Sequence, residues 1–231
     1  MKAFLKRKDI EFSLKRYGID ALGAMAQGLF CTLLVGTILK TIGEQFGVAF
    51  LIAPIGETGD SIATFATKMV GPAMAVAIGY AIHAPAMVLF SLIPVGFATN
   101  AIGGAGGPLA VYFIAVIASE FGKAVSKETK VDILVTPIVT ILVGVGLDSL
   151  IAAPLGRAAM AVGDIVMWAT GQQPFIMGIV VSVIIGIALT LPISSAAICA
   201  SIGLTGLAGG AALAGCCANM VGFAVASFRE N

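Results

Sequence analysis

Residues 165–228 form a stretch of 64 residues that contains no Asp, Glu, Lys, Arg or His. As a single helix it would be about 96 Å long, roughly three times the thickness of a bilayer's hydrocarbon core. The stretch must therefore fold back on itself. Breaks are predicted at Gln172-Gln173-Pro174, at Pro192, and by the glycines of its last third. Broken helices at membrane depth must be buried in protein or line a wet cavity, as in many transporter binding sites.

The composition predicts an all-α, polytopic membrane bundle with broken or re-entrant helices. The chain is 59% hydrophobic and only 11% charged, whereas a soluble domain carries about 25% charged residues. A net charge of +1 gives no electrostatic footprint for nucleic acid. No phosphate-binding glycine motif, no metal-ligand spacing of cysteines and no catalytic set is present. We therefore expect no cofactor, no metal and no stand-alone enzyme.

Residues 1–20 are predicted to form an amphipathic helix on the cytoplasmic face, and residues 21–231 the membrane domain. Six of the 13 Lys and Arg residues lie in this first segment, interspersed with apolar side chains. The next Lys-rich segment is 123–132. Four predicted crossings separate the two segments, so both lie on one side of the membrane, in agreement with the positive-inside rule.

Seven or eight membrane segments are expected. Residues 47–55 are apolar but too short to span, which predicts a re-entrant or interfacial segment. Residues 131–147 are predicted to be broken by Pro137, and 148–170 to form an amphipathic outer helix or a wetted crossing. Residues 196–228 are too long for one ordinary crossing, so a hairpin or broken pair is expected. The remaining predicted crossings are 21–42, 62–82, 85–102, 108–121 and 175–191.

Ser194 and Ser195 are the strongest candidates for solute binding. They follow Pro192 between two apolar segments, where hydroxyls, freed backbone groups and a helix N-terminus coincide. Ordinary helix capping by serine is the alternative. Asn219 lies inside an apolar helix and needs a partner, either a neighbouring helix or a substrate. Asn100, beside a run of glycines, binds a ligand or caps a helix.

Three acidic residues are further substrate-binding candidates. Glu57 and Asp60 lie in a Gly-containing turn, which is either the lining of a vestibule or a solvated loop. Asp148 is predicted near the outer end of a crossing, and ionisable residues at membrane depth are commonly functional. His83 is interpreted as a helix-end residue. The Glu120–Lys123 pair is interpreted as a solvated surface pair, with docking of a phosphocarrier as the alternative role of the loop that it introduces.

Several stretches resemble the IIC-type membrane components of bacterial sugar phosphotransferase systems, in the branch that includes perfringolysin-regulator-like membrane proteins. The Lys-rich segment 127–137 and the Pro-Ile-Ser-Ser segment within 191–197 are the more specific. Relatives continue through further helices beyond Asn231, so the resemblance implies a domain that is short at its C-terminus. The stretches are 103–112, 119–123, 127–137, 191–197 and 222–231.

The resemblance implies a carbohydrate-translocating component of the bacterial plasma membrane. It implies a small-molecule solute, separate soluble phosphocarrier subunits and a homodimer as partners, with no phosphocarrier domain in this chain. Two alternatives of other classes remain open from the sequence. One is a membrane-embedded regulator that binds a ligand without transport, and the other is a small-solute channel.

Overall fold

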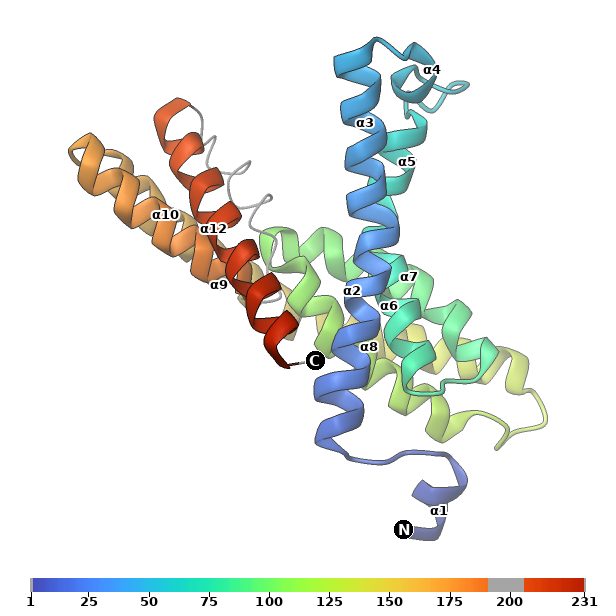
Figure 1. Cartoon of the computed structure of the whole chain (residues 1–231). Helices are drawn as coiled ribbons and strands as arrows, with labels where there is room; N and C mark the ends of the chain where they lie inside the picture. The colour runs from blue at the N-terminus through green and yellow to red at the C-terminus, as the bar shows by residue number, and fades with distance from the viewer. Residues whose placement is uncertain (1, 191–205, 231) are drawn as a thin grey trace. The chain divides into compact units, whose positions relative to one another are not determined.

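A computed structural model describes residues 2–190 and 206–230 (Figure 1). Every regular element in these two ranges is a helix. The chain divides into two compact units. Unit 1 comprises residues 1–102 and 110–152, and unit 2 comprises residues 103–109 and 153–231. The expected all-helical membrane architecture is confirmed.

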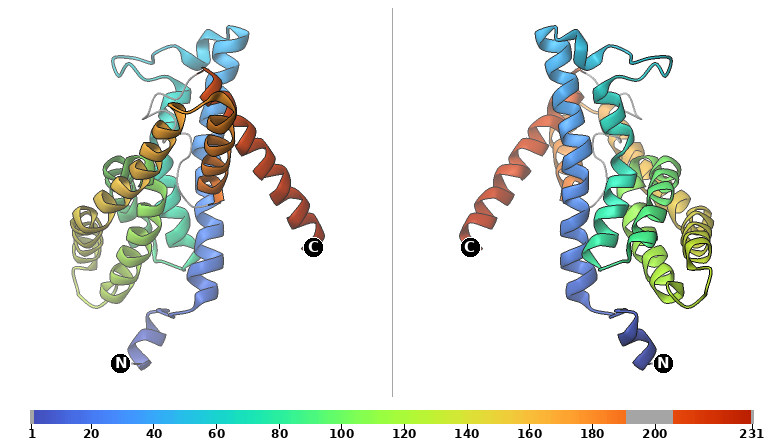
Figure 2. Two further views of the ribbon diagram at one scale, coloured as in Figure 1. Left: turned by 90° about the vertical axis from the view of Figure 1, so that its left-hand side faces the viewer. Right: turned by 90° about the vertical axis from the view of Figure 1, so that its right-hand side faces the viewer.

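The first membrane span is one continuous helical rod of 31 residues, Arg16–Phe46. It is preceded by the short helix α1 (Lys2–Arg7), and its parts are η1 (Arg16–Ala21), α2 (Leu22–Leu29), η2 (Phe30–Leu34) and α3 (Val35–Phe46). At about 1.5 Å per residue the rod is longer than a hydrocarbon core is thick. Within unit 1, α2 packs against α6 and α3 packs against α5 (Figure 2).

The segment after this rod, residues 47–55, does not form a membrane-spanning helix, as predicted from its length. It contains the four-residue helix α4 (Ala49–Ile52), which contacts α3. A turn follows, and Ser61 then caps the next helix by accepting a hydrogen bond from the Thr64 N–H at 3.2 Å. A serine at this position satisfies one of the free donors of the helix N-terminus.

The predicted crossing at residues 62–82 is broken. Helices α5 (Ile62–Lys68) and α6 (Val70–Ala81) meet at Met69 with a bend of 50°. Pro72 lies in the first turn of α6, where its missing N–H has no partner within the helix to lose. The pair is therefore either one broken span or a re-entrant loop, which confirms the expectation of broken helices in this bundle.

Close approach of backbones joins α6 to α7 (Ala86–Gly103). A Cβ atom on Gly71 would lie 2.1 Å from the Gly96 carbonyl oxygen, and one on Gly96 would lie 2.4 Å from that of Gly71. Only glycine fits at both positions. The run of glycines after Asn100 forms a short 3-10 helix, η3 (Gly104–Gly106), before α8 (Gly107–Val125).

Helix α9 (Asp132–Thr170) runs for 39 residues without interruption. The predicted break at Pro137 is therefore wrong, and so is the predicted separate helix from residue 148. Proline near the start of a helix costs one hydrogen bond, which a membrane helix tolerates where neighbouring groups compensate. The predicted turn at Gln172-Gln173-Pro174 is confirmed, because α9 ends at Thr170 and α10 (Pro174–Thr190) begins at Pro174.

In unit 2, α10 and α12 (Gly206–Glu230) lie side by side (Figure 1). An apolar cluster joins them to the last turns of α9, through Val166, Ala169, Met177, Val181, Ile185, Ala208 and Ala212. The hairpin or broken pair was expected over residues 196–228. From Gly206 onward this segment is one helix, and residues 196–205 lie outside the described residues. In the described ranges, five helices are long and apolar enough to cross a membrane, or six if the bent α5–α6 pair is one span.

Candidate functional site

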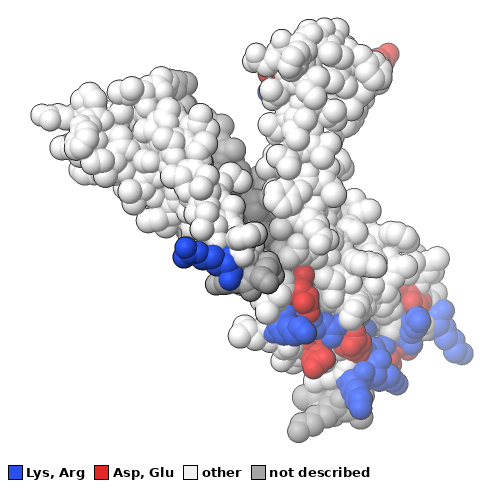
Figure 3. All heavy atoms as spheres, in the orientation of Figure 1, with Lys and Arg blue, Asp and Glu red and all other residues white. Residues whose placement is uncertain are grey.

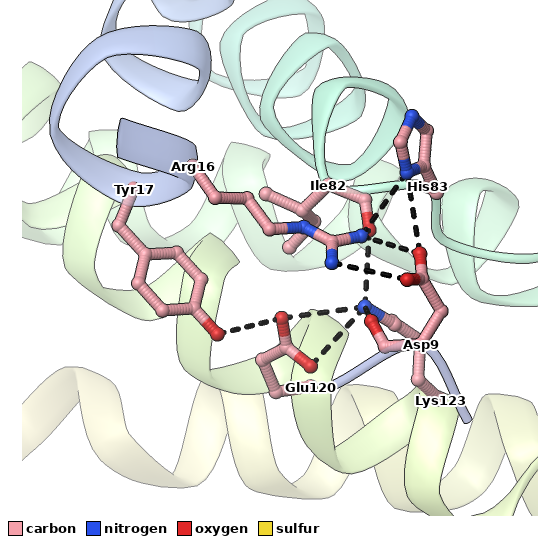
Figure 4. A network of polar contacts seen from close by, with 7 residues as sticks. All are labelled: Asp9, Arg16, Tyr17, Ile82, His83, Glu120 and Lys123. Carbon is pink, nitrogen blue, oxygen red and sulfur yellow. Dashed lines mark hydrogen bonds and ion pairs between the residues drawn. The ribbon is translucent and has the colours of Figure 1, made fainter. Parts of the chain in front are cut away.

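A charged network lies at the end of unit 1 that carries the N-terminus. It consists of Asp9, Arg16, Tyr17, His83, Glu120 and Lys123 (Figure 4). Asp9 comes from the loop after α1, and Arg16 and Tyr17 begin the first membrane span. His83 follows α6, and the other two lie in the last turns of α8. Charged side chains gather in this region, whereas the visible face of α10 carries none (Figure 3).

Lys123 is the centre of the charged network. Its ammonium group donates to the carbonyl oxygens of Asp9 at 2.5 Å and Ile82 at 3.0 Å, and it pairs with the Glu120 carboxylate at 3.3 Å. The residue is only 2% exposed. The expectation of a solvated Glu120–Lys123 surface pair is therefore wrong. The N-terminal segment covers the pair, and the sequence gives no sign of this contact because Asp9 is 114 residues away.

Arg16 joins the N-terminal loop to the end of α6. Its guanidinium donates to both carboxylate oxygens of Asp9, at 2.5 and 3.2 Å, and to the Ile82 carbonyl at 2.6 Å. The hydrogen bond from Arg16 lowers the pKa of Asp9 below its ordinary value of 3.8, because it favours the charged carboxylate. Asp9 is consequently ionised at neutral pH. The Nδ1 atom of His83 lies 3.1 Å from Arg16 Nη2 and 3.2 Å from Asp9 Oδ2.

Two tyrosines extend the network toward the first membrane span. The Tyr17 hydroxyl donates to the Glu120 carboxylate at 2.9 Å, and the Tyr112 hydroxyl donates to the Tyr17 carbonyl at 2.9 Å. Arg7 and Lys8 make a second, more exposed contact with the loop after α8. Both pair with Glu128, and Lys8 also donates to the Ser126 carbonyl. The N-terminal segment is thus held at two places near the C-terminal end of α8, at Lys123 and at the loop that follows the helix.

The charged network uses its polar groups mainly on one another, which indicates a structural role. Within the part of the chain that the structure describes, no group of three His, Cys, Asp or Glu side chains is arranged to hold a metal ion. A cavity of about 470 Å³ opens beside the network and presents acidic and basic side chains together. Its lining is Asp9, Glu11, Ser13, Lys15, Arg16, Asp20, Ala81 and His83.

A second polar pair lies inside the membrane-spanning part of unit 1. Asp148, on α9, is 1% exposed, and its Oδ1 atom lies 2.7 Å from the Thr99 hydroxyl of α7. The same hydroxyl lies 2.8 Å from the Val95 carbonyl oxygen. In the described part of the chain, Asp148 Oδ2 has no hydrogen-bond partner. The sequence placed Asp148 near the outer end of a crossing, whereas it lies within the candidate span Asp132–Ala158.

A groove in unit 2, the α10–α12 groove, presents uncharged polar groups. Its volume is about 370 Å³. Asn219 of α12 donates from Nδ2 to the Gly186 carbonyl of α10 at 2.8 Å, which confirms the interhelical partner expected for this amide. The full lining is Ser182, Val183, Gly186, Ile187, Thr190, Gly215, Ala218 and Asn219.

Gly215 is what allows the two helices to approach at this groove. A Cβ atom there would lie 2.2 Å from the Ser182 carbonyl oxygen. The small residue brings the amide of Asn219 and the hydroxyls of Ser182 and Thr190 to one surface. Hydroxyl and amide groups both donate and accept hydrogen bonds, as the hydroxyls of a carbohydrate do.

Comparison with known proteins identifies the family. The family described as Phosphotransferase system, EIIC matches residues 19–231. This chain belongs to that family. Searches of curated proteins and of solved structures give no match. The EIIC protein is therefore a multi-pass membrane component of a bacterial sugar-transport system, as its resemblance implied.

The other predicted site residues of the EIIC protein do not converge. Glu57 is exposed in the loop before α5, and Asp60 in the same loop pairs with Lys68 at 2.6 Å. Asn100 lies on α7 at the contact with α6, where a Cβ atom on Gly71 would approach its Cβ to 2.5 Å. Ser194 and Ser195 lie outside the described residues.

Sequence reasoning missed two sets of polar residues. Ser182 and Thr190 have no motif around them, but their spacing of eight residues places them on one face of a helix. That spacing is a usable signal once Asn219 is suspected. Arg16, Tyr17 and Asp9 were treated as parts of an amphipathic surface helix, because nothing local distinguishes a buried arginine from an interfacial one.

Proposed function

We propose that this EIIC protein binds and translocates a carbohydrate, in concert with separate phosphocarrier subunits, and that the α10–α12 groove contributes to the sugar site. The observation that carries the proposal is the meeting of Ser182, Thr190 and Asn219 at one groove of an uncharged region. Small-molecule sites combine an apolar lining with a few convergent polar groups. The groove fits that description, and its polar groups suit sugar hydroxyls.

Ser194 and Ser195 remain part of this proposal, since they follow Thr190 by only four and five residues in the sequence. Their hydroxyls are proposed to bind the sugar. Asn100, Glu57, Asp60 and Asp148 are secondary sugar-binding proposals. Of these, Asp148 is the weakest because it is almost fully buried.

The end of unit 1 that carries the charged network is proposed to face the cytoplasm. The basic N-terminal segment and the Lys-rich loop after α8 contact each other through Glu128 and Ser126. Two basic segments on one side of a membrane bundle support a cytoplasmic location under the positive-inside rule. A phosphocarrier subunit would dock at this face. We also propose a homodimer, which a molecular-mass measurement in lipid nanodiscs would test.

Saturable sugar binding by the purified protein in lipid nanodiscs tests the groove. A panel of sugars is screened first, and the best ligand is titrated into the wild type and the double variant Ser182→Ala with Asn219→Leu. A loss of at least tenfold in affinity is expected, since buried polar partners of a ligand contribute about 1–3 kcal/mol each. The matched control is Ser91→Ala, whose hydroxyl donates to the Met87 carbonyl of its own helix. Unchanged affinity in the double variant would refute the site.

A further inference from the structure

Asp148 is a buried acid with an incomplete set of partners. Its carboxyl group lies on α9, about 24 Å along the helix from Asp132, within the candidate span Asp132–Ala158. The residue is 1% exposed, and its Oδ2 atom has no hydrogen-bond partner among the residues that the structure describes. An ionised carboxylate in such a place would need several donors, because removing a charge from water is costly. Within residues 2–190 and 206–230, one side chain is within hydrogen-bond distance of this carboxyl group.

That neighbour is the Thr99 hydroxyl, which has a single proton to donate. Its oxygen lies 2.8 Å from the Val95 carbonyl and 2.7 Å from Asp148 Oδ1. Val95 O can only accept a hydrogen bond. If Thr99 donates to Val95, the second short contact needs a proton on Asp148. A neutral carboxylic acid that donates from Oδ1 to the Thr99 oxygen satisfies both contacts, whereas an ionised one leaves one of them without a proton.

On the described helices α7, α8 and α9, no charged side chain is placed beside Asp148 to offset a negative charge. Helix α7, which supplies Thr99, contains no charged residue over Ala86–Gly103. Helix α8 carries Glu120 and Lys123, but these flank Gly122, whose contact on α9 is Thr140. Thr140 is eight residues from Asp148, about 12 Å along the helix. On α9 itself, the nearest charged residues in the sequence are Asp132 and Arg157.

We propose that Asp148 and Thr99 form a proton-binding site inside the membrane. In the conformation described, Asp148 keeps the proton and uses it in a hydrogen bond to the Thr99 oxygen. The Thr99 hydroxyl in turn donates a hydrogen bond to the Val95 carbonyl. The ligand is a proton, and the site lies between α7 and α9. Any rearrangement that separates these helices and admits water would release the proton. This site is independent of the proposed sugar groove, which lies in unit 2.

Infrared difference spectroscopy of the protein in lipid nanodiscs tests the protonation state directly. The spectrum of Asp148→Asn is subtracted from that of the wild type at pH 7. A carbonyl-stretch band of a protonated carboxyl group is expected in the wild type only. Asp60→Asn, which removes an acid of an exposed loop, is the control and should leave that band in place. Carboxylate bands in place of the carbonyl band would overturn the proposal.

Thr99 variants and a pH series keep the proposal testable if Asp148→Asn folds poorly. Thr99→Val should shift the carboxyl band to the frequency of a free acid, whereas Thr99→Ser should not. In reversible unfolding between pH 6 and pH 8, a water-exposed aspartate has lost its proton. The folding equilibrium constant of the wild type should therefore fall about tenfold per pH unit more than that of Asp148→Asn. Equal pH dependence of the two proteins would contradict a bound proton.

Discussion

The charged network of unit 1 and the α10–α12 groove of unit 2 hold helices together in opposite ways. The charged network joins distant segments through a buried lysine and a buried arginine, which contact carboxylates and backbone carbonyls. The groove joins two helices through Gly215 and one amide. Charges that bond to one another are unavailable to a solute. Where small residues bring helices together, nearby hydroxyls and amides stay accessible to a solute. The groove is therefore the better candidate for solute binding.

Removal of the Lys123 charge should have the largest effect on stability. Lys123→Ala would leave the Glu120 carboxylate, which is 12% exposed, without its cation. It would also remove the Lys123 donor from the Asp9 carbonyl, whereas the Ile82 carbonyl would keep its hydrogen bond from Arg16. Breaking a buried pair in this way costs about 3–5 kcal/mol. Reversible unfolding in mixed micelles would measure it. Lys40→Ala is the control, because its pair with Glu44 is exposed at 3.8 Å and should contribute less than about 1 kcal/mol. If the two variants lose similar free energies of unfolding, the buried pair is no more stabilising than the exposed one.

Separation of α10 from α12 should have the next largest effect. Gly215→Val would place side-chain atoms against the Ser182 carbonyl oxygen, and overpacking of this kind costs about 1–3 kcal/mol. Sugar binding should be lost with it. Gly210→Val on the same helix is the matched control, because a Cβ atom there meets no atom of the described residues within 4 Å. If both valine variants unfold at the same denaturant concentration, close packing at Gly215 is not what positions the groove.

Removal of the interhelical amide of Asn219 should have a smaller effect on stability. Asn219→Leu removes the hydrogen bond to Gly186, and such bonds between membrane helices contribute about 1 kcal/mol. The denaturant midpoint should fall slightly, whereas sugar affinity should fall by more. Cys217→Leu, an exposed neighbour on α12, should change neither. A large loss of stability with unchanged sugar affinity would make Asn219 a packing residue only.

Acidification should have the smallest of these effects on stability, through the charged network. The folded-state pKa of Asp9 is depressed by Arg16, so the contact adds stability above the unfolded pKa and loses it as the pH falls through the folded value. The protection of residues 8–16 against hydrogen exchange, relative to an unstructured peptide at the same pH, should therefore decrease below about pH 4. In Asp9→Asn this protection should be low already at neutral pH. If the protection in the wild type does not change with pH, Asp9 is not what holds the segment.

The sequence predicted local features well because their causes are local. The turn at Gln172-Gln173-Pro174 follows from proline geometry and the limited length of a membrane crossing. Pro137 misled the prediction, since a membrane helix can continue through proline when its neighbours compensate. Lys123 could not be predicted as buried, because its partners Asp9 and Ile82 are 114 and 41 residues away. Asn219 was recognised as needing a partner, but only packing identified Gly186.

Uptake into proteoliposomes is the most direct test of carbohydrate translocation by this EIIC protein. Vesicles that contain the wild type, with and without phosphocarrier subunits from the same cells, are given the sugar that binds best. We expect saturable accumulation that requires the phosphocarriers and is lost in the Ser182→Ala with Asn219→Leu variant. Saturable binding without any accumulation would contradict transport and favour a regulator. Flux that does not saturate would favour a channel.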